Sequence, residues 1–184
     1  MSIFTKHTDK TAPKGAAEVL AKVMERYGFI PNLAAYVAEA PQALDAVMAL
    51  SSSFDKTAFA PKEQQLILLI VSVMNGCDYC RTAHTGMGRM AGLDDATVKA
   101  ALRLERLPDD KLNALMDFTS SMVKEKGFVS DDKVLAFLNA GYTKGQVFEL
   151  VMGIALKTLS NYCNHLAKAK PNPEFVAMAE GRGM

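Results

Sequence analysis

Apolar residues recur at helical spacing along most of the chain, and this periodicity predicts an all-α fold. One such helix face is formed by Val19, Leu20, Val23, Met24 and Tyr27. Gly28 follows directly and suits a helix C-terminus. No segment shows sustained alternation of apolar and polar residues, and Asn75-Gly76 lies between two helical patterns rather than between β-rich runs. The sequence therefore predicts helices joined by short turns.

The most apolar segment, residues 66–74, is the one place where a buried strand competes with a helix. Pro61 and Glu63 suit the first and third positions of a helix that runs to Asn75. The resulting length of about fifteen residues favours a buried helix over a strand. Further helix starts are indicated at Pro31, at Pro108 and at the Thr143/Gln146 capping box.

The chain of 184 residues fits a single all-helical domain spanning 1–184, with a redox core at about 41–127. A faint echo at an offset of 49 residues links the turns at Gly92 and Gly141. It is explained either by two related helical halves or by helix hairpins that reuse the same turn residues.

Composition and charge narrow the class of protein. Apolar residues make up 49% of the chain and charged residues 22%, which is typical of globular proteins. A net charge of +1, without a basic stripe, argues against nucleic acid as a partner. The longest apolar run is far shorter than the roughly 20 residues of a membrane span, and the N-terminus does not resemble a signal peptide. We therefore expect a cytoplasmic protein with no membrane partner.

Cys77, Cys80 and His84 form the sharpest chemical pattern in the sequence. In a helix that begins after Gly76 these three side chains share one face. A helix N-terminus and a nearby imidazole both favour the thiolate form of cysteine. A peroxide attacked by one thiolate leaves a sulfenic acid, which the second thiol condenses to a disulfide. The spacing thus predicts a complete oxidation half-cycle that needs neither metal nor cofactor.

The order of attack is ambiguous at this level. The helix dipole favours Cys77 as the nucleophile, whereas a proton acceptor at His84 favours Cys80. We predict Cys80 as the attacking thiol, because the neighbouring base can take its proton and later protonate the leaving hydroxyl.

Other readings of the three residues remain open. One is a zinc site completed by His84 with Cys163 or His165. Another is a pair of buried structural cysteines beside a chance histidine. A third is an oligomeric binding protein whose assembly responds to a disulfide without significant turnover.

The sequence Asn75-Gly-Cys-Asp-Tyr-Cys-Arg-Thr-Ala-His84, after a buried apolar helix, resembles the core of the alkyl hydroperoxidase D family. This family belongs to the carboxymuconolactone decarboxylase superfamily. Residues 28–33 and 159–167 resemble flanking signatures of its peroxidase-related branch. The resemblance covers roughly residues 28–180.

This resemblance implies an all-helical homo-oligomer, commonly a trimer or hexamer, that reduces hydroperoxides in antioxidant defence. It also implies electrons from a thiol reductant, such as a lipoylated or thioredoxin-like protein. Cys80, Cys77 and His84 then correspond to the attacking thiol, the resolving thiol and the proton relay. Decarboxylase members lack the cysteine pair, so its presence argues against lactone decarboxylation.

One position departs from the family pattern. Gln65 stands where the family carries a glutamate that feeds the histidine relay. A glutamine can orient an imidazole through a hydrogen bond but cannot accept its proton. Glu63 is the nearest substitute in sequence and Glu149 a remoter one. Gln65 and Glu63 are therefore both candidate members of a proton relay.

Overall fold

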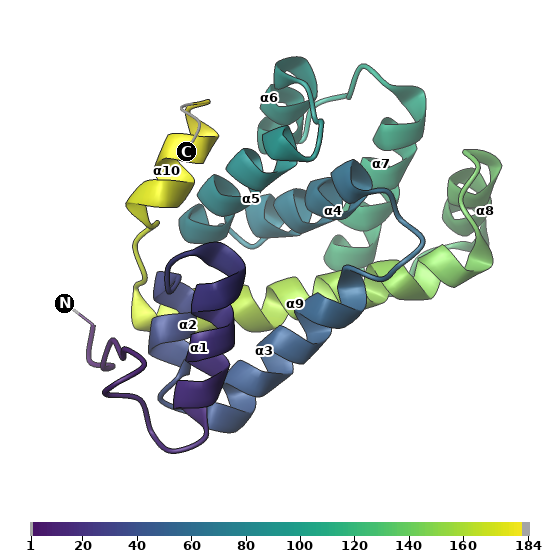
Figure 1. Cartoon of the computed structure of the whole chain (residues 1–184). Coiled ribbons are helices and arrows are strands. Elements are labelled where there is room, and N and C mark those ends of the chain that lie inside the picture. The colour runs from purple at the N-terminus through teal and green to yellow at the C-terminus, as the bar shows by residue number, and fades with distance from the viewer. Residues whose placement is uncertain (1, 182–184) are drawn as a thin grey trace.

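The computed structural model describes residues 2–181, and this part of the chain contains ten α-helices and no strand (Figure 1). The all-α prediction is confirmed. The helices are α1 (Ala16–Tyr27), α2 (Asn32–Val37), α3 (Pro41–Phe54), α4 (Pro61–Met74), α5 (Asp78–Met90), α6 (Asp95–Arg103), α7 (Asp110–Lys124), α8 (Asp131–Asn139), α9 (Lys144–Ala167) and α10 (Pro173–Ala179).

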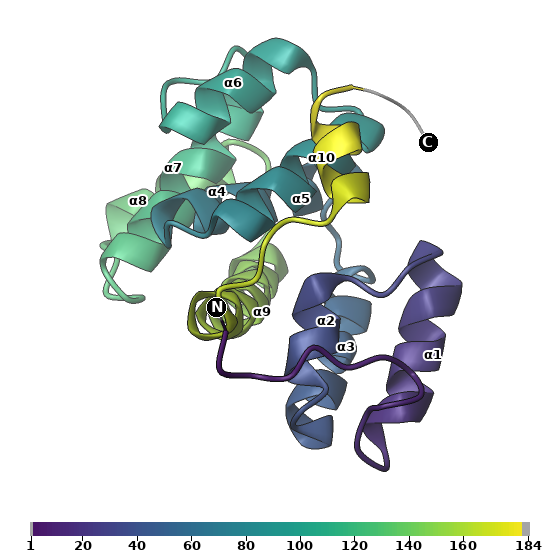
Figure 2. The same cartoon turned by 90° about the vertical axis from the view of Figure 1, so that its left-hand side faces the viewer.

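The helices are arranged in two groups on either side of α9. Helices α1 to α3 lie together on one side, and α4 to α8 lie on the other (Figure 2). The first group shares a small apolar core that includes Leu20, Val23 and Leu44, whereas the larger core is centred on α4 and α7. Helix α9 packs against α2, α3 and α4 and so joins the two groups.

Residues 66–74, for which both a buried strand and a helix were considered, belong to the buried helix α4. Pro61 occupies its first turn, and the Glu63 carboxylate accepts a hydrogen bond from the backbone N–H of Ala60 at 2.9 Å. The side chains of Ile67 and Leu69 are fully buried. Burial on all faces explains why this helix is apolar all round.

The turn after α4 places the cysteine pair. Gly76 adopts a positive φ of 66°, a conformation that is cheap only for glycine. The backbone N–H of Cys77 then bonds the carbonyl of Ser72, which closes the end of α4. The chain reverses here, so α5 starts at Asp78 and packs back against α4.

Other helix boundaries agree with the predicted turn residues to within a few positions. Gly28 caps α1 in the left-handed conformation, and Thr143 and Gln146 form the capping box of α9. The start expected at Pro108 lies slightly later: Asp109 is the N-cap of α7, because its carboxylate accepts the N–H of Leu112. None of the helices within residues 2–181 is long and apolar enough to cross a membrane.

Helix α10 covers one side of α5 (Figures 1 and 2). The two helices approach closely at Gly86, where a Cβ atom would lie 2.5 Å from the Cβ of Met178. The segment before α10 is held by Asn172, whose Oδ1 accepts hydrogen bonds from the Tyr79 hydroxyl at 3.0 Å and the Asn32 N–H at 2.8 Å. Helices far apart in sequence thus meet beside the cysteine pair.

Candidate active site

The two cysteines flank the first turn of α5. Cys77 is the N-cap residue, with extended backbone, and Cys80 lies within the helix one turn later. Our expectation that Cys77 would lie inside the first turn is off by one position. Both side chains are buried, with 1% exposed, and both are free thiols. The Cys77 thiol donates a hydrogen bond to the Cys80 sulfur.

A cavity of about 110 Å³ adjoins Cys80 and His84. It lies between the two helix groups, and α1, α2, α3, α4, α5, α9 and α10 all contribute to its wall. The wall is mainly apolar and includes Leu33, Val47 and Phe175. Cys77 is not among the described residues of this wall. Of the two cysteines, Cys77 and Cys80, only Cys80 borders the cavity.

The pKa of Cys80 is lowered to about 5. The largest cause is the interaction with the Cys77 thiol; the positive charge of Lys157 and the nearby polar side chain of Asn161 add to it, while burial opposes them. The amide nitrogen of Asn164 lies 3.2 Å from the Cys80 sulfur and donates to it. Cys80 is therefore a thiolate at neutral pH.

The same hydrogen bond has the opposite effect on Cys77. Its pKa is raised, first because its thiol proton is shared with the Cys80 sulfur and second because the side chain is buried. The pair therefore holds one proton, on Cys77. This arrangement suits a nucleophile at Cys80 and a resolving thiol at Cys77.

His84 faces the cavity but is held by Gln65. Its Nδ1 atom lies 2.9 Å from Gln65 Oε1. Because an amide oxygen only accepts hydrogen bonds, Nδ1 carries the proton and Nε2 is left as an acceptor. Burial, followed by the charge of Lys157, lowers the pKa of His84 well below its usual range. His84 is therefore neutral.

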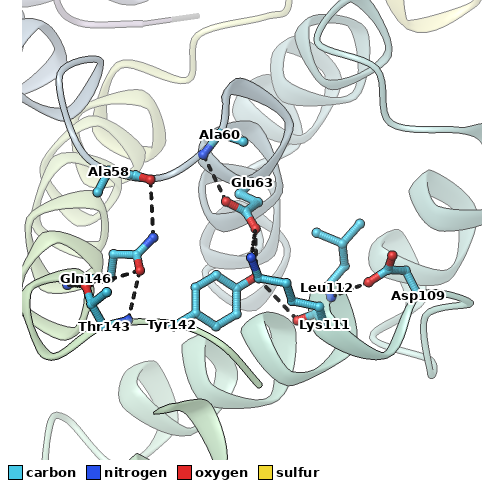
Figure 3. A network of polar contacts seen from close by, with 9 residues as sticks. All are labelled: Ala58, Ala60, Glu63, Asp109, Lys111, Leu112, Tyr142, Thr143 and Gln146. Carbon is cyan, nitrogen blue, oxygen red and sulfur yellow. Dashed lines mark hydrogen bonds and ion pairs between the residues drawn. The ribbon is translucent and has the colours of Figure 1, made fainter. Parts of the chain in front are cut away.

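Glu63, the other candidate for the proton relay, lies in a different network (Figure 3). Its Oε1 accepts a hydrogen bond from the Tyr142 hydroxyl at 3.0 Å and lies 3.5 Å from Lys111 Nζ. With the bond from Ala60, these contacts tie the start of α4 to α7 and to the turn before α9. The structure brings Gln65 to His84 and does not bring Glu63 there. Glu149 bonds the N–H of Ala58 instead.

Three residues of α9 at the site were missed by our reading of the sequence: Lys157, Asn161 and Asn164. The signal for Lys157 was a lone charge in the otherwise uncharged run 150–160, which is unusual in a buried helix. Asn161 and Asn164 stand one turn and two turns further along the same helix. Both lie in the segment 159–167, which we linked to the family without assigning roles within it.

The residues that a zinc site would need are dispersed. Within residues 2–181 no three His, Cys, Asp or Glu side chains are grouped so that they could hold a metal ion. His165 is exposed, and Cys163 packs against the apolar core of α1 to α3. His7 lies elsewhere and bonds Glu39.

Comparison with solved structures identifies the fold. A peroxidase-related protein with an alkylhydroperoxidase AhpD core, from Ralstonia eutropha JMP134, superposes with a TM-score of 0.87 at 22% identity, covering 98% of this chain and 96% of the other. A peroxidase-related protein from Silicibacter sp. TM1040 has a TM-score of 0.76 at 20% identity, covering 90% and 88%. A variant of the debrominase Bmp8, in complex with 2,3,4-tribromopyrrole, has a TM-score of 0.81 at 16% identity, covering 99% and 98%.

A family model matches part of the chain. The carboxymuconolactone decarboxylase family model matches residues 38–120, a segment that contains α3 to α6, the cysteine pair and the start of α7. No curated protein matches the sequence. The family model thus matches the segment that carries the cysteine pair, and the fold of the whole chain is AhpD-like.

Proposed function

We propose that the protein is a thiol-dependent peroxidase in which Cys80 attacks a hydroperoxide and Cys77 resolves the product. The observation that carries this proposal is the opposite shift in the pKa of the two thiols, with the thiolate on the one that borders an apolar cavity. A thiolate is the reactive form of cysteine, and a protonated thiol nearby is the group that a resolving step requires.

The proposed cycle needs no metal or cofactor. The Cys80 thiolate displaces an alkoxide from the hydroperoxide and becomes a sulfenic acid. The Cys77 thiol then attacks this sulfur, a disulfide forms, and water leaves. His84, whose proton lies on Nδ1 so that Nε2 can accept one, is the candidate for carrying protons between these groups.

The partners follow from the same proposal. An external dithiol must reduce the disulfide, and a lipoylated or thioredoxin-like protein of the cytoplasm has the required chemistry. A homo-oligomer, trimeric or hexameric, remains our expectation for the assembly.

The direct test uses the reduced protein and tert-butyl hydroperoxide. We expect one hydroperoxide consumed per two thiols lost, with mass spectrometry locating a Cys77–Cys80 disulfide. Cys80→Ser should abolish consumption, and Cys77→Ser should still react once and stop at the sulfenic acid. Undiminished consumption by Cys80→Ser would contradict the proposal.

A second candidate is reductive dehalogenation, favoured by the fold shared with a debrominase and by the apolar cavity beside a thiolate. In that reaction two thiols and an aryl bromide give a disulfide, the dehalogenated ring and hydrogen bromide. Bromide release from 2,3,4-tribromopyrrole, without oxidation by hydroperoxides, would favour it. If the disulfide instead changed only the size of the particle, the protein would be a redox-responsive oligomer.

A further inference from the structure

Lys157 is a buried cation without an acidic partner. Its side chain is 5% exposed and lies in the cavity wall between Leu156 and Ser160. No Asp or Glu is among the described residues of that wall, and within residues 2–181 Lys157 forms no ion pair with a carboxylate. A buried ammonium without a counter-charge is strongly unfavourable, because the ion has lost its hydration and nothing replaces it.

The counter-charge is the sulfur of Cys80. Lys157 and Cys80 line the same cavity, and the positive charge of Lys157 favours the thiolate form of this sulfur. The other titratable residues of the wall are Tyr27, Tyr79 and His84. Burial raises the pKa of both tyrosines, and His84 is neutral. The thiolate and the ammonium are therefore the two charges that the cavity contains.

An attack by Cys80 on a hydroperoxide removes one of these two charges. The thiolate becomes an uncharged sulfenic acid, and negative charge moves to the departing alkoxide. If the ammonium kept its proton, the apolar cavity would retain an unpaired cation. Neutral His84 has no proton to give at Nε2, because its single ring proton is on Nδ1, bonded to Gln65.

We propose that Lys157 is the acid that protonates the leaving oxygen when Cys80 attacks a hydroperoxide. This inference rests on the proposed function and assigns a residue beyond the Cys-x-x-Cys-x-x-x-His centre. In the step, the S–O bond forms, the O–O bond breaks, sulfur loses two electrons to the peroxide, and a Lys157 proton passes to the alkoxide. The products are an alcohol, a sulfenic acid and a neutral amine, so no charge remains in the cavity.

The remaining steps restore the starting state. Cys77 and the sulfenic acid give a disulfide and water, with the Cys77 proton leaving in the water. A dithiol reductant then supplies two electrons and two protons. One proton returns to Cys77 and the other to Lys157, so that the thiolate–ammonium pair forms again.

The test separates the charge of Lys157 from its ability to donate a proton. Lys157→Arg keeps a positive charge, but a guanidinium does not give up its proton. Lys157→Met removes both properties. Lys144→Met changes an exposed lysine at the start of the same helix and serves as the matched control.

Two oxidants and one absorbance measurement provide the readouts. The ultraviolet absorbance of the thiolate, in the Cys77→Ser background, reports whether Cys80 stays ionised. tert-Butyl hydroperoxide releases an alkoxide that needs a proton, whereas peracetic acid releases acetate, which does not. Thermal melting of each variant verifies that it is folded.

We expect Lys157→Arg to keep its thiolate and its rate with peracetic acid while losing about 10²-fold with tert-butyl hydroperoxide, the range typical of general acid catalysis. Lys157→Met should lose thiolate absorbance at neutral pH and react slowly with both oxidants. Wild-type rates of Lys157→Arg with tert-butyl hydroperoxide would overturn the donor role alone. Failure of the wild-type protein to react with any hydroperoxide would overturn the proposed function, and the donor role with it.

Discussion

The two thiols, Cys80 and Cys77, differ in protonation state because their neighbours differ. Asn164 donates to Cys80, and Lys157 and Asn161 add further stabilisation from the same face of α9. Cys77 at the N-cap keeps its proton, which points to the Cys80 sulfur. One residue position in α5 thus holds the negative charge, and the position one turn earlier holds the proton.

Acidification should protonate the Cys80 thiolate and so stop its reactions. Because the pKa of Cys80 is lowered, its thiolate is fully formed at neutral pH and is lost as the pH falls through about 5. We expect alkylation of Cys80 by iodoacetamide to be constant above about pH 6 and to fall about tenfold per pH unit below the pKa. Mass spectrometry of the alkylated peptides measures this rate at each site.

Cys163 is the internal control for that profile. Burial raises the pKa of its thiol, so its alkylation should still be increasing between neutral and alkaline pH. A Cys80 rate that also increases through this range would show that the thiolate is not stabilised by its neighbours.

Residue spacing was enough to find Cys77, Cys80 and His84, because all three lie within two turns of one helix. The partners on α9 could not be found in this way. Lys157 is 77 positions beyond Cys80 in sequence, and only the packing of α9 against α4 brings it to the sulfur. A local pattern cannot specify a contact that depends on how two distant helices cross.

At the scale of single helices, α4 and α5 are held in place by different kinds of contact. Helix α4 is fixed at its start by the polar contacts of Glu63 (Figure 3), and α5 is fixed by the close approach of α10 at Gly86. The first of these features was visible in the sequence, because Pro61 and Glu63 predicted the start of α4. The reason for Gly86 was not visible, since it depends on Met178 of a different helix.

Glu63→Ala should destabilise the protein while leaving the site intact. The variant loses the acceptor of the Ala60 N–H and of the buried Tyr142 hydroxyl, and we expect a loss of about 1–3 kcal/mol in the free energy of unfolding. Denaturant unfolding measures this change. Lys62→Ala, an exposed neighbour, is the control.

The same variant tests whether Glu63 belongs to the proton relay. From its position we expect the rate of oxidation by tert-butyl hydroperoxide to stay within about twofold of wild type. A tenfold lower rate in a protein that is still folded would instead place Glu63 in the relay.

Gly86→Ala should displace α10. An added Cβ would meet the Cβ of Met178 at 2.5 Å and its backbone at 3.0 Å, so α10 must shift. Overpacking of this kind costs about 1–3 kcal/mol and outweighs the gain in helix propensity of roughly 1 kcal/mol. Faster proteolytic cleavage before α10 and a lower melting temperature are the expected results.

Gly145→Ala is the matched control for that experiment. Gly145 lies in the first turn of α9, where an added Cβ would lie 3.7 Å from the Thr143 hydroxyl oxygen, an ordinary van der Waals distance. This substitution should leave the melting temperature unchanged or raise it. Equal effects of the two substitutions would contradict a specific role for the contact between α5 and α10.

At the scale of the whole molecule, the cavity exists because two groups of helices meet along α9. Residues of the first group, such as Ala34 and Leu44, supply much of the apolar wall, while the sulfur and its polar partners come from the second group and α9. The sequence predicted the helices of both groups. It did not predict their arrangement, which depends on packing between segments separated by more than a hundred residues.

Ala34→Leu should narrow the cavity and change the selectivity of the protein between large and small peroxides. Ala34 is buried in the wall, and three additional carbon atoms there take up space that an alkyl group needs. We expect the rate with tert-butyl hydroperoxide to fall about tenfold, equivalent to about 1.4 kcal/mol, while the rate with hydrogen peroxide changes little. Stopped-flow oxidation with both peroxides gives the ratio.

Ala46→Leu changes an exposed alanine of α3 and should leave the ratio of the two rates unaltered. Equal losses with both peroxides in Ala34→Leu would indicate that the wall does not discriminate between them.

The depth of the two sulfur atoms has a kinetic consequence. With 1% of either side chain exposed, a protein as large as a lipoylated or thioredoxin-like reductant cannot reach the disulfide while α10 and the α1–α3 group stay in place. Regeneration by such a reductant must then wait for a transient opening of the chain. The rate of regeneration should therefore reach a maximum set by that opening, however much protein reductant is supplied. With a small soluble dithiol, the rate should reach a higher maximum or should not saturate.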